Sequence, residues 1–268
     1  MIVNGPNDRT IPELIVQSQI GSARQICSAI VDLEELGAKE AVPAMLELLS
    51  FPNEGVRANA VHAIGALGDE EAAQKLFALL EDSSSLVRLN TIESLGLLGA
   101  VASIQRIAGI LHADDDPLVR VQAAQTLGIF NDPSALPALV EALDDADEGV
   151  RAYAADSIGT IGILTALPNL LRKVDVERSI FVKAFLLSSI YRLRKDNDFS
   201  SLIQLIEVAD DVLAGTILNL IAELVTPQNA ADIKARIIKI TQSRRSLTAE
   251  VSSLMTKLDC LRPDNVRI

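Results

Sequence analysis

The chain repeats one segment of sixteen residues, and this repetition limits the folds open to it more than any other feature. "NEGVRANAVHAIGALG" from Asn53 returns as "SSLVRLNTIESLGLLG" from Ser84 and as "DEGVRAYAADSIGTIG" from Asp147. Aligned on the Val-Arg pair, the units are 31, 32, 31 and 32 residues apart, at Arg57, Arg88, Arg120, Arg151 and Lys183. Arg24 and Gly215 extend the period backwards and forwards. A constant period of this length indicates stacked units that bury their apolar faces only against one another.

Each unit is expected to form two helices. The first carries apolar residues three or four positions apart, as at Leu136, Leu139 and Leu143. The second follows acidic capping residues and ends at Gly159 and Gly162, because glycine tolerates left-handed or closely packed backbone. Hydrophobic residues make up 49% of the chain and aromatic residues 3%, which favours packed helices over sheets. We therefore predict an all-α fold, an α-solenoid (superhelix) of about eight short helical hairpins.

The expected organisation is a short arm followed by one solenoid. Residues 1–10 are interpreted as an N-terminal arm, for which the sequence allows either an ordered or a disordered state. Residues 11–268 are interpreted as a single solenoid with irregular repeats from about residue 175. Cys27 and Cys260 have neither zinc-site nor CxxC spacing, which favours a reducing compartment. The sequence shows neither a signal peptide nor an apolar run of membrane-spanning length, so we expect a cytoplasmic protein without membrane insertion.

Within the second helix, some positions keep their residue type and others change from unit to unit. Numbered from the arginine as zero, positions −1, +3, +4 and +7 hold small or apolar residues and are predicted to pack the units together. Positions +2 and +5 change, and we expect them outside the core, on the concave surface with which solenoids bind partners. We call them the variable rows: Asn59, Asn90, Gln122, Tyr153 and Phe185 at +2, and His62, Glu93, Gln125, Asp156 and Ser188 at +5.

Aromatic and basic residues gather in residues 178–195. Tyr153 and Phe185 occupy adjacent positions of the +2 row, and Arg192 follows Phe185 on the same helix. Aromatic residues beside arginine are typical of binding hot spots, so Arg192 joins the variable rows as a predicted partner-binding residue. The alternative is that Phe181 and Phe185 fill a junction where the repeats become irregular.

The recurring arginines form what we call the arginine column: Arg57, Arg88, Arg120 and Arg151. Their guanidinium groups are suited to clamping a polyanion such as tetrapyrrole propionates. We favour a structural role, in which each arginine binds backbone carbonyls or turn carboxylates of its own or an adjacent layer. The acids available for this role include Asp69, Asp82, Asp115 and Asp144.

No constellation of residues predicts catalysis or a metal site. His62 and His112 lie on different helices without a thiol or acid at ligand spacing. The acidic runs at 112–117 and 144–148 match no calcium loop and precede helix N-termini, where carboxylates act as caps. We therefore predict no catalytic residue and no metal ligand.

The pattern VR-x-x-A-x-x-x-[IL]-G-x-[IL]-G, found over most of Arg24 to Lys195, resembles the short HEAT-like repeat of the phycobilisome bilin lyases. The resemblance implies a solenoid. Its members include lyases that attach linear tetrapyrroles to phycobiliproteins, commonly as pairs of related chains, and also non-enzymatic adaptors. Residues 22–37 lack the aromatic residues of bilin-handling members, so no catalytic residue is carried over.

These observations favour a non-enzymatic scaffold or adaptor that holds another protein in its concave groove and needs no cofactor. One alternative is a phycobilin lyase or lyase subunit that handles phycocyanobilin or another bilin, with a phycobiliprotein or a second HEAT-like chain as partner. Another is an inhibitor or immunity-type binding protein. The net charge of −12 argues against a nucleic-acid partner. The charge is uneven, since residues 1–170 carry 24 Asp or Glu and 9 Lys or Arg, against 12 and 15 in residues 171–268.

Overall fold

A computed structural model describes residues 9–195, 199–243 and 247–260, and the part it describes contains helices and no strands. The α-helices fall into eight successive pairs, so the predicted all-α solenoid of about eight hairpins is confirmed. Their bounds are α1 Ile11–Gln19, α2 Ala23–Glu35, α3 Val42–Glu47, α4 Glu54–Leu67, α5 Glu70–Leu76, α6 Ser85–Leu97, α7 Ile104–Ala113, α8 Pro117–Phe130, α9 Leu136–Ala142, α10 Glu148–Ile161, α11 Leu167–Val176, α12 Ile180–Arg194, α13 Ser200–Val208, α14 Asp211–Leu224, α15 Ala230–Ser243 and α16 Thr248–Cys260.

Short 3-10 turns flank several first helices. These turns are η1 Lys39–Ala41, η2 Leu48–Ser50, η3 Phe77–Glu81, η4 Val101–Ser103, η5 Pro133–Ala135 and η6 Leu164–Ala166. Proline occupies the first turn of α3, α8 and α11, where the missing N–H costs no hydrogen bond.

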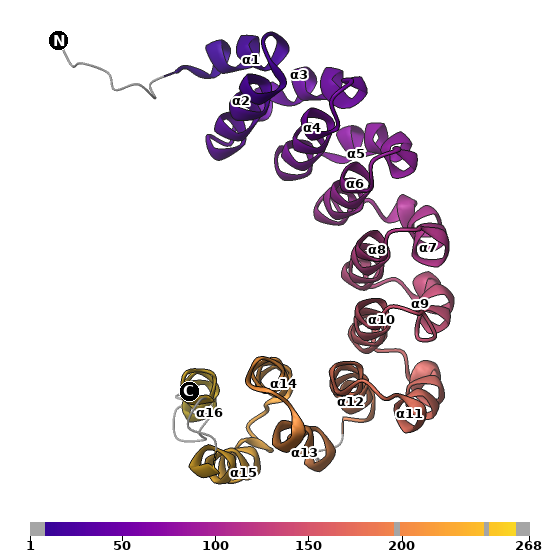
Figure 1. Ribbon diagram of the computed structural model, residues 1–268, viewed down its shortest axis with the longest axis vertical. Coiled ribbons are helices and arrows are strands. Elements are labelled where there is room, and N and C mark those ends of the chain that lie inside the picture. Colours follow the sequence, from indigo (N-terminus) through magenta and orange to yellow (C-terminus); the bar gives the residue numbers. More distant parts are fainter. Residues whose placement is uncertain (1–8, 196–198, 244–246, 261–268) are drawn as a thin grey trace, which may run out of the picture. The chain divides into compact units, whose positions relative to one another are not determined.

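The chain divides into two compact units, Met1–Ala138 and Leu139–Ile268, with the boundary inside α9. In the first unit, the second helices α2, α4, α6 and α8 form the inner row of a curved stack, and the first helices form the outer row (Figure 1). In the second unit, α10, α12, α14 and α16 form one row, and α11, α13 and α15 form the other. A single solenoid over residues 11–268 stays a prediction. Of the predicted arm, residues 1–8 lie outside the described residues.

The positions predicted to pack the layers form the core. Val56, Ala60, Val61 and Ile64 of α4 are fully buried, and so are the equivalent residues of α6, α8 and α10. The small residue at +3 is Ala60, Thr91, Ala123 or Ala154, each at 0% exposure. A small side chain at this position lets adjacent second helices approach closely.

Glycines inside the second helices bring neighbouring layers still closer. A Cβ on Gly159 would lie 2.6 Å from Oγ and 2.9 Å from Cα of Ser189, and Gly65 meets Ser94 in the same way. The hydroxyl of Ser189 donates to the carbonyl of Ala155 at 2.7 Å, across the same interface. Gly159 lies within α10, which continues to Ile161, so the prediction that the helix ends at Gly159 is wrong. The glycine instead allows the close contact with Ser189. Gly162 does end α10, with a left-handed φ of 73°.

The period shifts in the first and the seventh helix pair. In α4, the arginine of the repeat, Arg57, lies four positions after the N-cap residue Asn53. The N-cap residue of α2 is Ser22, and the residue four positions after it is Ile26. The position equivalent to the arginine is therefore Ile26, which is buried, and not Arg24. The cap of α14 is Asp210, which by the same count places Ala214, and not Gly215, at this position.

Candidate partner-binding surface

The arginine column joins successive layers through paired hydrogen bonds. The guanidinium of Arg57 donates from Nε and Nη2 to the two carboxylate oxygens of Asp82, each at 2.8 Å. Arg88 binds Asp114 in the same way at 2.7 and 2.8 Å. In the second unit, Arg151 binds Glu177 at 2.9 and 3.2 Å. In each pair the acid comes about 25 residues after the arginine, so it belongs to the turn of the next layer.

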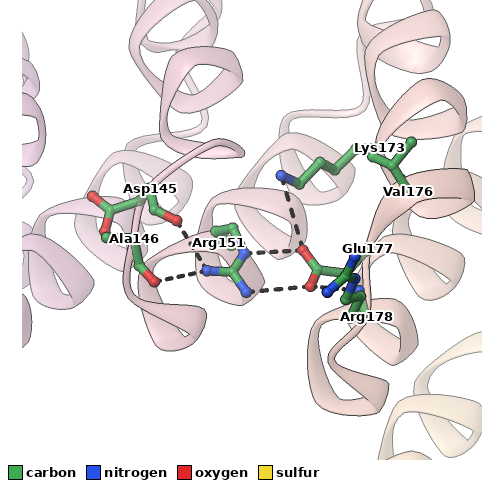
Figure 2. Close-up of a pocket in the computed structure, with 7 residues that line it drawn as sticks. All are labelled: Asp145, Ala146, Arg151, Lys173, Val176, Glu177 and Arg178. Carbon is green, nitrogen blue, oxygen red and sulfur yellow. Dashed lines mark hydrogen bonds and ion pairs between the residues drawn. The ribbon is translucent and has the colours of Figure 1, made fainter.

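The remaining nitrogen of each guanidinium, Nη1, donates to backbone carbonyls of the turn before its own helix. Nη1 of Arg88 donates to the carbonyl of Asp82 at 2.8 Å, and Nη1 of Arg151 donates to the carbonyls of Asp145 and Ala146 (Figure 2). Arg120 makes the equivalent bond to the carbonyl of Asp114 at 2.7 Å. Each of these arginines therefore holds its own turn, and Arg57, Arg88 and Arg151 also bind the acid of the following one.

Backbone N–H groups bind the same carboxylates and lower their pKa values. Hydrogen bonds from Arg57 are the main reason that the pKa of Asp82 is lowered. Burial acts to raise the pKa of Glu177, but the bonds from Arg151 and from the N–H groups of Ser179 and Arg178 lower it to about 2. Burial likewise acts to raise the pKa of Asp114, but hydrogen bonds from Arg88 and from the N–H group of Asp116 lower it. These acids therefore stay ionised at neutral pH.

The acids that bind the column only partly match the sequence prediction. Asp82 was predicted and binds Arg57, whereas Asp114 takes the role suggested for Asp115. Asp69 instead caps α5, and Asp144 pairs with Lys173 at 2.9 Å. A polar pocket of about 380 Å³ next to Arg151 is lined by Lys173, Glu177 and Arg178 (Figure 2). The fork of Arg151 is occupied by protein carboxylate and carbonyl oxygens, which supports the structural interpretation over the polyanion clamp.

The solvent side of each second helix carries four positions and not two. Positions −2, +2, +5 and +9 are spaced by four, three and four residues, so they lie along one helical stripe. We call this set the solvent stripe. Apart from Arg192 at position +9 of α12, sequence reasoning found only its two central positions, although the same spacing would have revealed the outer two. The stripes are Gly55, Asn59, His62 and Ala66 on α4; Leu86, Asn90, Glu93 and Leu97 on α6; Leu118, Gln122, Gln125 and Ile129 on α8; Gly149, Tyr153, Asp156 and Thr160 on α10; Phe181, Phe185, Ser188 and Arg192 on α12; and Val212, Thr216, Asn219 and Glu223 on α14.

In the first unit, the stripes of α6 and α8 have exposed apolar ends and a polar centre. Leu86, Leu97, Leu118 and Ile129 are 50%, 62%, 64% and 65% exposed. Between them, the half-buried amide of Asn90 donates to the carbonyl of Ala58 at 3.1 Å, and that of Gln122 donates to Thr126 Oγ1 at 3.3 Å. On α4, the amide of Asn59 donates to the carbonyl of Gly55, and the exposed His62 lies 3.3 Å from Glu34.

In the second unit, aromatic rings and an ion-pair chain occupy the stripes. The ring of Phe185 lies 5.6 Å from that of Tyr153 and 5.0 Å from that of Phe181, measured between centroids. Arg192 reaches from Asp156 Oδ1, at 2.7 Å, to Glu223 Oε2, at 2.6 Å. The side chain of Arg192 on α12 therefore links the stripes of α10 and α14.

The prediction that the variable rows lie outside the core is wrong at two positions. Phe185 is only 7% exposed because the rings of Tyr153 and Phe181 cover it, which is the arrangement expected of a plug. Ser188 is completely buried, and its hydroxyl has no hydrogen-bond partner within the described residues. The remaining variable-row residues are half-buried or exposed. On α12, the positions of the solvent stripe that a partner can reach are therefore Phe181 and Arg192.

The described residues contain no group of three His, Cys, Asp or Glu side chains that one metal ion would reach. Burial raises the pKa of the Cys27 thiol. None of the helices within the described ranges combines the length and the apolar character needed to cross a bilayer.

The sequence matches the HEAT-repeat family over residues 22–96, 75–159 and 104–190. These overlapping matches cover more than half of the chain. The chain belongs to the HEAT-repeat family. No curated protein matches the sequence of this HEAT-repeat protein.

Several solved structures share the fold of this HEAT-repeat protein at low sequence identity. YibA of Escherichia coli is 18% identical with a TM-score of 0.58, and the match covers 94% of this chain and 93% of that one. Kap121p bound to Nup53p is 15% identical with a TM-score of 0.58, over 93% of this chain and 33% of Kap121p. The complex of CpcE and CpcF of phycocyanin lyase from Nostoc is 19% identical over 97% of each chain, with a TM-score of 0.49. At these identities the first two comparisons show the fold alone, and the third is too distant to support an inference about activity.

Proposed function

We propose that this HEAT-repeat protein is a non-enzymatic scaffold that binds another protein through the solvent stripes of its second helices. One observation carries the proposal: the packing positions repeat in type and are buried, whereas the stripe positions differ from layer to layer and are accessible at most places. Packing does not require Leu118, Gln122, Gln125 and Ile129 on one helix. Side chains that are free of packing constraints and are arranged along an inner row are what solenoids use for recognition.

The proposal fits both the fold and the chemistry of the stripes. Kap121p, which shares the fold, is solved with the protein Nup53p bound to it. In the second unit, the stripes contain the half-buried rings of Tyr153 and Phe181 and the half-buried guanidinium of Arg192, which are residue types enriched in interface hot spots. In the first unit, four aliphatic side chains of α6 and α8 are at least half exposed. The proposed scaffold requires no cofactor, and we propose that it acts in the cytosol.

The test compares two charge-introducing double variants of the full chain. Leu97→Asp with Ile129→Asp changes the solvent stripes, whereas Val101→Asp with Leu164→Asp changes outer 3-10 turns whose side chains are 54% and 60% exposed, against 62% and 65% for the first pair. Proteins captured from the native cell by the wild type are identified and quantified, and circular dichroism checks that each variant is folded.

We expect a partner that the wild type and the outer-turn variant both retain and the stripe variant loses. Equal retention by all three proteins would place the interface elsewhere, and the absence of any partner dependent on the stripes would contradict the scaffold function.

A further inference from the structure

The solvent stripes of α6 and α8 differ from the others in a way that points to the conformation of the partner. Both read apolar, polar, polar, apolar: Leu86, Asn90, Glu93 and Leu97 on one helix, and Leu118, Gln122, Gln125 and Ile129 on the next. Because the two helices pack side by side, Asn90 with Gln122 and Glu93 with Gln125 form two polar rows. These polar rows lie between two apolar rows, Leu86 with Leu118 and Leu97 with Ile129. In the first unit, α4 has Gly55 and Ala66 at the outer positions, so the apolar rows are confined to the two later layers.

The polar rows carry amides whose hydrogen-bonding capacity is only partly used. The amide nitrogens of Asn59, Asn90 and Gln122 each donate to an acceptor within the protein, and these bonds fix the direction of the side chains. Within the described residues, no donor reaches their amide oxygens, and Gln125 makes no hydrogen bond. Each layer from α4 to α8 therefore presents a fixed acceptor, with unused donors beside it.

Amides pair with polypeptide backbone, which offers the same donor and acceptor groups. A helical partner has already paired its backbone groups internally, whereas an extended segment leaves them open along its length. Three layers spaced by about 8–10 Å extend over roughly 20 Å, which an extended chain covers with about six residues.

The apolar rows match the side chains of such a segment. Positions −2 and +9 are eleven residues apart, so the rows lie about 16 Å from each other along the helices, with the amides between them. Successive side chains of an extended segment point to opposite sides, and each apolar row would therefore receive alternate residues.

Charge defines the segment further. Glu93 lies between the apolar rows and has no ion-pair partner within the described residues, and residues 1–138 contain 18 Asp or Glu against 8 Lys or Arg. Resting on the proposed scaffold function, we infer that α4, α6 and α8 bind an extended segment of a partner protein, about six residues long, with at least one Lys or Arg and with alternating apolar side chains against α6 and α8.

The experiment selects peptides from a display library of random linear twelve-residue sequences against the full-length protein. A second library, in which every peptide is held helical by a side-chain staple, is screened in parallel. Enriched peptides are then measured by fluorescence anisotropy against the wild type, against Asn90→Ala with Gln122→Ala, against Leu86→Ser with Leu118→Ser, and against Val101→Ser, whose side chain lies on the outer turn η4 and is 54% exposed. Circular dichroism checks that each variant is folded.

We expect linear peptides with apolar residues at every second position and a Lys or Arg to be enriched. Each double variant should weaken their binding at least tenfold, whereas Val101→Ser should leave it within twofold. N-methylation of alternate backbone nitrogens should also weaken binding at least tenfold.

Enrichment of stapled peptides alone, insensitivity to N-methylation, loss of binding in Val101→Ser but not in the double variants, or no enrichment would each overturn this inference. None of these results affects the capture of a native partner. The scaffold function is therefore tested separately, by the capture experiment with the two charge-introducing variants.

Discussion

The ion pair between Arg151 and Glu177 gives a quantitative prediction for the stability of the stack. We expect Glu177→Gln to remove the charge with little change of shape, because glutamine still accepts hydrogen bonds from the N–H groups of Arg178 and Ser179. The pKa of Glu177 falls from its ordinary value of 4.5 to about 2 on folding. One pKa unit corresponds to about 1.4 kcal/mol, so the ionised carboxylate contributes about 3 kcal/mol at pH 7.

The sign of the pH dependence follows from the lowered pKa. A carboxyl group whose pKa is lower in the folded state stabilises that state fully above the unfolded pKa, here 4.5. Its contribution is lost as the pH falls through the folded pKa of about 2. The difference in unfolding free energy between the wild type and Glu177→Gln should therefore decrease from about 3 kcal/mol at pH 7 to about 1.5 kcal/mol at pH 3.

Urea unfolding followed by circular dichroism measures this difference at both pH values. Asp175→Asn is the matched control, since Asp175 lies in the last turn of α11, two residues before Glu177, is exposed and makes no hydrogen bond within the described residues. We expect the control to change the unfolding free energy by less than about 0.5 kcal/mol. An equal loss in both variants, or a loss in Glu177→Gln that is the same at pH 7 and pH 3, would refute the reasoning.

Three further predictions follow from other contacts. Gly159→Ala should cost about 2 kcal/mol of unfolding free energy because its Cβ meets the backbone of Ser189 at 2.9 Å, whereas Gly109→Ala on α7 has nothing within 4 Å and should be neutral or stabilising. Similar urea midpoints for the two would contradict the close packing of the layers. Ser188→Ala should raise the unfolding free energy by about 1 kcal/mol by removing a buried hydroxyl without a partner, whereas Ser189→Ala removes a hydroxyl that donates to Ala155 and should lower it. A loss in both would mean that Ser188 has a partner in solution. Phycocyanobilin mixed with the protein should keep its visible absorption spectrum, and a shifted band would favour the bilin-lyase alternative over the scaffold.

The sequence predicted the surface less completely than the core. The positions that pack the layers were evident, because Val56, Ala60, Val61 and Ile64 recur in type at a constant period and have the burial that this implies. The outer stripe positions of α6 and α8 were missed because residues such as Leu86 and Leu118 are apolar and resemble core residues in a sequence, although they are 50% and 64% exposed. Phe185 and Ser188 were assigned to the surface by register alone, and neighbouring aromatic rings reversed the expectation for Phe185.

The sequence by itself determined the helical hairpin, its period and its buried face, because these depend on local spacing and on a contact that is the same in every layer. The tertiary structure decided which acid binds each arginine, since Asp114 and Asp115 are adjacent in a run of three aspartates and only the geometry of the turn directs one of them to Arg88. It also decided why Gly159 is glycine, because the reason lies in Ser189 of the next layer, thirty residues away. Periodicity specifies what all layers share, and the contacts between particular layers determine where they differ.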